Sequence, residues 1–120
     1  MARTNVPVTD LTTATSTADP AGTTADPTNG HTITGVRPEV LVFRVKNTTA
    51  GSLNAIVRAG SQPLAPSSGQ GDLTVAVAAG ATVFIGPLES ARFLQNDGSI
   101  SLDLQATFTG TVTAFRTNRR

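Results

Sequence analysis

The chain has 120 residues, 14% of them charged, and a formal net charge of +1, which suits one domain with a single modest core and an uncharged polar surface fit for protein contacts. Cysteine is absent, which excludes disulfides, thiolate nucleophiles and Cys-ligated metals. Trp and Tyr are also absent, and five Phe residues supply all the aromatic content, which disfavours a stacking platform for single-stranded nucleic acid or an aromatic shelf for sugars.

The first thirty residues predict an extended arm. A short candidate strand starts at Val6, and residues 12–29 are dominated by Thr, Ala, Ser, Gly and Pro. Ala-Asp-Pro occurs twice in this stretch, and each proline favours extended geometry for its predecessor while offering no amide donor. Because so little of it can enter a core, we expect residues 1–30 to form an arm that a neighbouring polypeptide holds, ahead of a body formed by residues 31–120.

The opening residues contain no apolar run as long as that of a signal peptide. No window approaches the ~20 apolar residues that a membrane span needs. We therefore expect neither classical export nor insertion into a membrane.

Residues 39–60 predict the central β-hairpin of the body. Leu41, Phe43 and Val45 alternate with residues of the opposite face, as in a half-buried strand. The segment Asn-Thr-Thr-Ala-Gly-Ser then supplies turn residues, and the alternation resumes over residues 53–57. We therefore expect these two strands to pair with each other.

The remaining segments are short and closely spaced. Asp97-Gly98 supplies the positive φ angles of a tight hairpin and is expected to join strands over residues 91–95 and 99–105, although residues 88–94 also allow one helical turn. In the last segment Phe115 faces away from Val112 and Ala114, which a bulge or burial of both faces would explain. With further strands expected over residues 31–34, 73–77, 82–85 and 110–116, the pattern predicts an all-β domain, an antiparallel β-sandwich or jelly roll of about eight short strands with Greek-key connections.

Each candidate for a chemical site has a structural explanation that we favour. His31 is the only histidine, and catalysis or metal binding would need partners that the sequence does not place nearby. The Asn-Thr-Thr segment at Asn47 matches a glycosylation acceptor, but the same residues are needed as a turn. The Gly-Gln-Gly-Asp segment ending at Asp72 lacks the Lys-Ser/Thr ending and the helix of a phosphate loop.

The other candidates are weaker. Ser90 lies beside Glu89 but in no nucleophile elbow. The turn at Asp97 has one acidic residue where a calcium loop needs several, and the basic end after Arg116 carries few enough charges to be simply solvated. We therefore expect no catalytic residue, no cofactor, no metal and no enzymatic activity.

Six segments spread over nearly the whole chain carry a family resemblance: Val6-Pro-Val-Thr, Asp26-Pro-Thr-Asn-Gly-His31, Val45-Lys-Asn-Thr-Thr-Ala50, Gly69-Gln-Gly-Asp-Leu-Thr-Val75, Phe84-Ile-Gly-Pro-Leu-Glu-Ser-Ala-Arg-Phe93 and Gly110-Thr-Val-Thr-Ala-Phe-Arg116. In this combination the chain resembles a family of small virion-associated proteins of tailed bacteriophages and prophages that infect actinobacteria. The family supplies no catalytic residue to carry over.

The resemblance implies a capsid decoration or cement protein. Such a protein is made in the host cytoplasm, binds the outside of the phage head and stabilises the shell by bridging neighbouring copies of the major capsid protein. A homo-oligomer, in particular a trimer, is expected on the capsid surface, with no membrane and no direct contact with nucleic acid. The arm is the expected clamp, and its candidate interface residues are Val6, Val8, Leu11, Asp19, Pro20, Asp26 and Pro27.

Two alternatives stay open from the sequence. One is a tail-tube or neck component of the same particle. The other is an adhesin or glycan-binding β-sandwich displayed on the virion, which the absence of Trp and Tyr disfavours.

Overall fold

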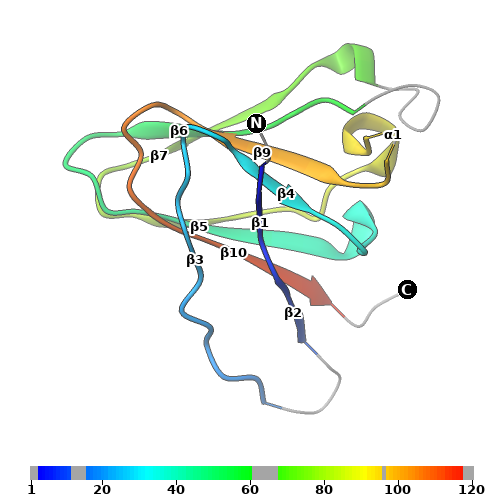
Figure 1. Ribbon diagram of the computed structural model, residues 1–120, viewed down its shortest axis with the longest axis horizontal. Coiled ribbons are helices and arrows are strands. Elements are labelled where there is room, and N and C mark those ends of the chain that lie inside the picture. Colours follow the sequence, from blue (N-terminus) through cyan, green and yellow to red (C-terminus); the bar gives the residue numbers. More distant parts are fainter. Residues whose placement is uncertain (1–2, 12–15, 61–67, 96, 118–120) are drawn as a thin grey trace.

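Two mixed β-sheets pack face to face in the computed structural model, which describes residues 3–11, 16–60, 68–95 and 97–117 (Figure 1). One sheet has the strand order β1-β4-β9-β6-β7 and is called the β6 sheet here. The other has the order β2-β10-β5-β8 and is called the β5 sheet. The strands are β1 (Thr4–Asn5), β2 (Val8–Leu11), β3 (Thr23–Thr24), β4 (His31–Ile33), β5 (Leu41–Asn47), β6 (Leu53–Val57), β7 (Leu73–Val77), β8 (Thr82–Ile85), β9 (Ile100–Leu104) and β10 (Gly110–Thr117), with one helical turn α1 (Ser90–Phe93) and short 3-10 turns at Pro38–Val40 and Ser68–Gln70.

The strands from β3 to β10 are arranged as a jelly roll. β3, β10, β5 and β8 are successive neighbours in one sheet, and β4, β9, β6 and β7 are successive neighbours in the other. All of these pairs are antiparallel. The chain changes sheet at every step except between β6 and β7, which gives the two Greek keys of a jelly roll. The all-β sandwich expected from the sequence is therefore confirmed.

The core lies between the sheets and uses the alternating positions that the sequence indicated. Leu41, Phe43 and Val45 on β5 are fully buried, as are Ile100 and Leu102 on β9. Burial of one such side chain contributes roughly 1.5–3 kcal/mol relative to its exposure. The inward faces of the strands are therefore what holds the two sheets together.

The expected hairpin between residues 41–47 and 53–57 is wrong, because the two strands belong to different sheets. β5 pairs with β10 and β8, whereas β6 pairs with β7 and β9. Asn47 ends β5 at the corner, where its Oδ1 accepts the N–H of Thr49 at 2.9 Å and its Nδ2 donates to the carbonyl of Gly51 at 3.0 Å. The turn residues therefore turn the chain from one sheet into the other.

The expected strand over residues 91–95 is also wrong. Ser90–Phe93 is a helical turn, α1, which is the alternative that residues 88–94 allowed. Phe93 is buried from this turn, and the backbone N–H of Gln95 donates to the carbonyl of Ser99. Asp97 then closes a turn into β9 rather than a hairpin between two strands.

The two faces of β10 are both covered, which explains the position of Phe115. Val112 and Ala114 face the core with no exposed surface, while Phe115 on the opposite face is only 8% exposed. The guanidinium of Arg44 lies over the Phe115 ring, 5.6 Å from its centroid. Burial of both faces, one of the two explanations considered from the sequence, is therefore the correct one.

The arm is held by its own chain, which corrects the expectation that only another polypeptide would hold it. β1 pairs in parallel with β4, and β2 pairs in parallel with β10. Between them Val6 is 1% exposed, and its N–H donates to the carbonyl of Thr32 at 3.0 Å. Figure 1 shows this dark blue segment passing from the level of β4 and β9 to that of β10. The arm is thus a strap that runs from one sheet to the other.

The boundary at residue 30 does not coincide with a structural boundary. β3 lies inside the range assigned to the arm, yet it is the first strand of the jelly roll and pairs with β10. The backbone N–H of Ala25 continues this pairing by donating to the carbonyl of Gly110 at 2.9 Å. Main-chain hydrogen bonds therefore anchor a stretch that contains few apolar side chains.

Candidate functional site

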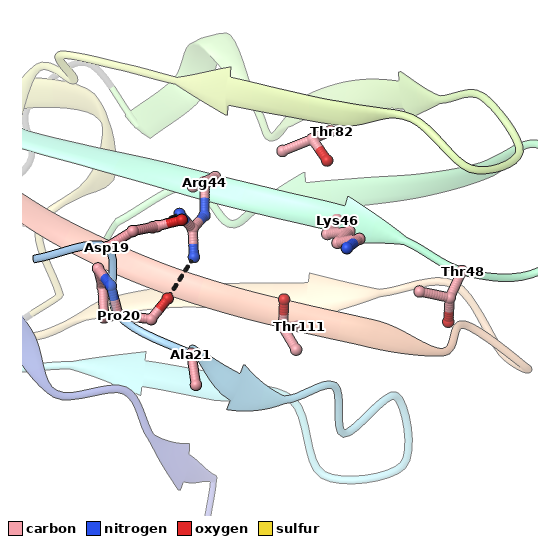
Figure 2. A pocket seen from close by; sticks show the side chains of 8 residues that line it. All are labelled: Asp19, Pro20, Ala21, Arg44, Lys46, Thr48, Thr82 and Thr111. Carbon is pink, nitrogen blue, oxygen red and sulfur yellow. Dashed lines mark hydrogen bonds and ion pairs between the residues drawn. The ribbon is translucent and has the colours of Figure 1, made fainter.

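An open polar depression of about 480 Å³ lies on the outer face of the β5 sheet, where the arm crosses it (Figure 2). Its floor comes from outward-facing residues of β5, β10 and β8, and one wall comes from the arm. We call it the Arg44 depression. Its lining residues are Asp19, Pro20, Ala21, Arg44, Lys46, Thr48, Thr82 and Thr111.

Arg44 fixes the arm over this face. Its Nη1 forms an ion pair with Asp19, and its Nη2 donates to the carbonyl of Pro20 at 2.8 Å and to Oγ1 of Thr113 at 3.1 Å. The guanidinium also lies over the Phe115 ring, and such a planar fork is well suited to several acceptors at once. Only 15% of the Arg44 side chain is exposed. Arg44 therefore holds structure and has little capacity left for a further ligand.

The arm approaches β10 closely at this point. Gly22 has a φ of +93°, and a Cβ there would lie 2.7 Å from Oγ1 of Thr113. A smaller cavity of about 130 Å³ remains between the arm and β10, lined by residues of both. The close passage needs glycine because both the backbone conformation and the contact exclude a side chain.

Lys46 differs from Arg44 because its side chain is exposed and its ammonium group has no ion-pair or hydrogen-bond partner within the part of the chain that the structure describes. Figure 2 shows it farther along β5 than Arg44, between Thr82 on β8 and Thr111 on β10. An ammonium group flanked by hydroxyls suits an anionic oxygen, such as a carboxylate. The depression can therefore accept one acidic group beside Lys46.

The segment from Asp26 to His31 is a structural latch between the arm and β4. The Asp26 carboxylate accepts hydrogen bonds from Oγ1 of Thr4 at 2.6 Å and from the N–H of Asn29 at 3.2 Å. The hydrogen bond from Thr4, with those from Asn29, lowers the pKa of Asp26. The backbone N–H of Asp26 in turn donates to Nε2 of His31 at 3.0 Å.

His31 is completely buried, and burial lowers its pKa below the ordinary value of 6.5. Because Nε2 accepts a hydrogen bond, the neutral ring must carry its proton on Nδ1. The sequence favoured a structural role for this histidine, and these contacts give it one.

A ladder of ion pairs crosses the outer face of the β6 sheet. Asp103 pairs with Arg3 of the arm and with Arg58 of the β6 end, and Arg58 also pairs with Asp72 at 2.8 Å. Burial raises the pKa of Asp103, but the hydrogen bonds and charges of the two arginines outweigh it and hold that pKa low. The second Asp72 oxygen accepts the N–H of Ala59 at 2.6 Å. The Gly-Gln-Gly-Asp segment therefore serves to fasten strands together.

The candidate interface residues of the arm do not form one surface. Asp19 and Leu11 are exposed, whereas Val8 packs against the core as a half-buried residue. The remaining residues take part in intramolecular structure or are partly covered: Val6 is buried, Asp26 belongs to the latch, and Pro20 and Pro27 are half-buried.

The other sequence candidates have local roles. Asn47 is fully buried, and its side-chain nitrogen donates within the chain, so it cannot serve as a glycosylation acceptor in this fold. Asp97 accepts the N–H and the hydroxyl of Ser99. Arg116 forms a two-bond pair with Asp10 on the neighbouring β2. The side chain of Ser90 and residues 118–120 lie outside the described part of the chain.

Sequence reasoning missed Lys46 and Phe84 as surface features. Both lie on the outer face of the β5 sheet, and Phe84 is 66% exposed. The alternating pattern of β5 already placed Arg44 and Lys46 on the face that points away from the core. The missing information was that β8 is the neighbour of β5.

Among the described residues, no group of three or more His, Cys, Asp and Glu side chains is placed to hold a metal ion. No helix in that part of the chain has the length and apolar character of a membrane span. Comparison of the chain with protein-family models, curated proteins and solved structures gives no significant match.

Proposed function

We propose that the chain is a non-catalytic structural protein of a tailed bacteriophage, a decoration or cement protein that binds the outside of the head and bridges copies of the major capsid protein. The observation that carries the proposal is the resemblance of six segments, from Val6 to Arg116, to virion proteins of actinobacterial phages. The jelly roll is compatible with it, since viral capsid domains use this architecture among others. That compatibility is an analogy of fold, and a fold alone does not assign a function.

The arm gives this proposal no support. Its strands pair with β4 and β10, and Val6 fills the core of its own domain. A clamp built from these residues would have to give up those contacts first. We therefore place the shell-binding surface on the exposed outer face and free edge of the β5 sheet rather than on residues 3–11.

Stabilisation of a shell by so small a domain follows from repetition. A capsid presents the same site many times, so an oligomer that bridges two copies gains avidity without a large interface at each contact. A protein that binds the assembled shell and not the free subunits stabilises the shell by linkage. Bridging requires more than one binding site, which fits the homo-oligomer, in particular a trimer, that the resemblance implies on the capsid surface.

The proposal is tested by adding the purified chain to shells and to dissociated capsid protein of the phage that encodes it, and sedimenting both. We expect saturable co-sedimentation with shells alone and a higher temperature of shell disruption. Equal binding to free subunits, or no binding to shells, would overturn the proposal. Ring-shaped assemblies of the chain seen by electron microscopy would instead assign it to the tail tube or neck.

A further inference from the structure

β8 is the last strand of the β5 sheet, and its outer edge has no neighbouring strand among the described residues. The hydrogen-bond pattern identifies which groups are free. The N–H of Asn47 donates to the carbonyl of Ala81 at 2.9 Å, and in an antiparallel pair only every second residue bonds to the partner strand. Val83 and Ile85 therefore bond to β5, whereas Thr82 and Phe84 direct their backbone N–H and C=O groups away from it.

The same two residues share the outer face of the sheet. Phe84 lies opposite Arg44, and Thr82 lies opposite Lys46. Phe84 is 66% exposed, although most of the other large apolar side chains in the described chain are buried or half-buried. An exposed ring on a free sheet edge is a site where an added strand can bury apolar surface while it satisfies backbone groups.

The positive charge of Lys46 on the outer face of the β5 sheet favours one kind of added strand beside β8. The ammonium group of Lys46 has no hydrogen-bond or ion-pair partner within the described residues, and the Arg44 depression lies open beside it. A residue paired with Thr82 from outside would lie two strands away from Lys46, roughly 10 Å between Cα atoms. A glutamate and a lysine together span that distance, so an acidic side chain opposite Thr82 reaches the depression.

We propose that β8 is a docking edge for an extended segment of another polypeptide, which adds as an antiparallel strand with an apolar residue opposite Phe84 and an acidic residue opposite Thr82. In the antiparallel direction the apolar residue precedes the acidic one by two positions. Main-chain hydrogen bonds supply affinity, and the two side chains supply specificity. The proposal does not depend on the virion role, because it concerns the isolated domain.

A second copy of this chain fits the edge poorly. β8 contains no acidic residue, so a second β8 strand would bring no carboxylate to Lys46 of either copy. Charge complementarity therefore favours a foreign acidic segment over self-association.

The test uses the full chain labelled with ¹⁵N and a capped peptide, Thr-Thr-Leu-Thr-Glu-Thr-Thr. We expect saturable NMR shifts centred on Thr82 and Phe84. Phe84→Ser should weaken binding of the peptide about tenfold. Leu11→Ser is the matched control, because Leu11 is an exposed apolar residue on the opposite edge of the same sheet, and it should leave binding unchanged.

Lys46→Glu should weaken binding of the same peptide about threefold, and it should restore binding to a peptide that carries Lys in place of Glu. Arg37→Glu makes the same charge change elsewhere on the chain and should have neither effect.

Methylation of the peptide backbone separates strand addition from simple apolar contact. N-methyl groups on the Leu and Glu amides, which face β8 in the proposed register, should abolish binding, and the same groups on the intervening Thr amide should not. Absence of binding, or equal effects of the two methylation patterns, would overturn the proposal. A concentration-dependent dimer of the chain alone that Phe84→Ser abolishes would also overturn it, in favour of a second copy. Peptide binding without shell binding would leave this inference standing while the proposed function fails.

Discussion

The side-chain nitrogen of Asn47 donates to the carbonyl of Val77 at 2.9 Å, so one amide at the end of β5 joins the two sheets of the jelly roll. The same nitrogen lies within hydrogen-bond reach of the carbonyls of Gly51 and Ala78, and the side chain has no exposed surface. The corner between β5 and β6 is therefore built on a single buried polar side chain.

Replacement of this residue should be among the most costly single changes in the chain. Asn47→Ala leaves the buried carbonyl of Val77 and the Thr49 N–H without their partner, so we expect a loss of about 2–3 kcal/mol of unfolding free energy. Thr48→Ala is the matched control, because Thr48 is exposed and bonds only at the surface. Urea denaturation measures both. Equal effects of the two substitutions would contradict the role of Asn47.

The arm should behave as part of the folded domain. Val6→Ala removes buried methyl groups between the sheets and should cost about 2 kcal/mol. Leu11→Ala, on the exposed end of the same segment, should cost less than about 1 kcal/mol. Hydrogen exchange of the Val6 amide should be as slow as that of core strands. Fast exchange together with a negligible Val6→Ala effect would show that the arm leaves the domain.

How far the sequence predicted the fold is clearest at β5 and the arm. The alternation of Leu41, Phe43 and Val45 correctly predicted which side chains face the core. It carried no information on which strand lies beside β5, because both neighbours, β10 and β8, are distant in the sequence. Turn residues after β5 fitted a hairpin and a change of sheet equally well.

The sequence did not show that the arm is held by its own domain, because backbone hydrogen bonds provide most of the contacts that hold it. β3 is Thr-Thr, and its pairing with β10 uses main-chain groups that any residue provides. Val6 is the one fully buried apolar side chain of residues 3–11, and Val8 packs half-buried against the core. Likewise nothing in the sequence placed Asp19 beside Arg44, since that contact depends on the path of the arm over the sheet.

Lowering the pH should weaken the fold through His31. The unfolded ring takes up a proton near pH 6.5, whereas burial lowers the pKa of the folded ring. Below pH 6.5 the unfolded state therefore binds more protons than the folded state. The stability that the neutral His31 ring contributes above pH 6.5 is lost as the pH falls through the pKa of the folded ring. Asp26 raises this pKa and Arg3 lowers it, but burial is the largest influence.

Denaturation between pH 7.5 and 5 measures this effect. His31 is the only histidine, and the carboxyl groups with lowered pKa, such as Asp26 and Asp103, lose their contribution to stability only as the pH falls below about 5. His31→Gln keeps an acceptor for the Asp26 N–H and should flatten the profile in this range. A profile that stays equally steep in His31→Gln would contradict the assignment.

Arg44 and Asp19 should contribute unequally to the arm. Arg44→Lys keeps the charge but loses the fork that reaches Pro20 and Thr113 and the guanidinium contact with the Phe115 ring, so we expect a loss of about 1–2 kcal/mol. Asp19→Asn should cost less than about 1 kcal/mol, because the Asp19 side chain is 79% exposed. Denaturation and the rate of proteolysis within residues 16–22 measure the two variants. A larger effect for Asp19→Asn would contradict this account.

The central claim, that the chain binds the outside of an assembled phage shell, is tested most directly by electron cryomicroscopy of the encoding phage with and without this protein. The account predicts density for a two-sheet domain on the outer surface of the head, repeated with the capsid lattice and missing from particles that lack the protein. Density confined to the neck or tail, or identical particles in the two samples, would contradict it.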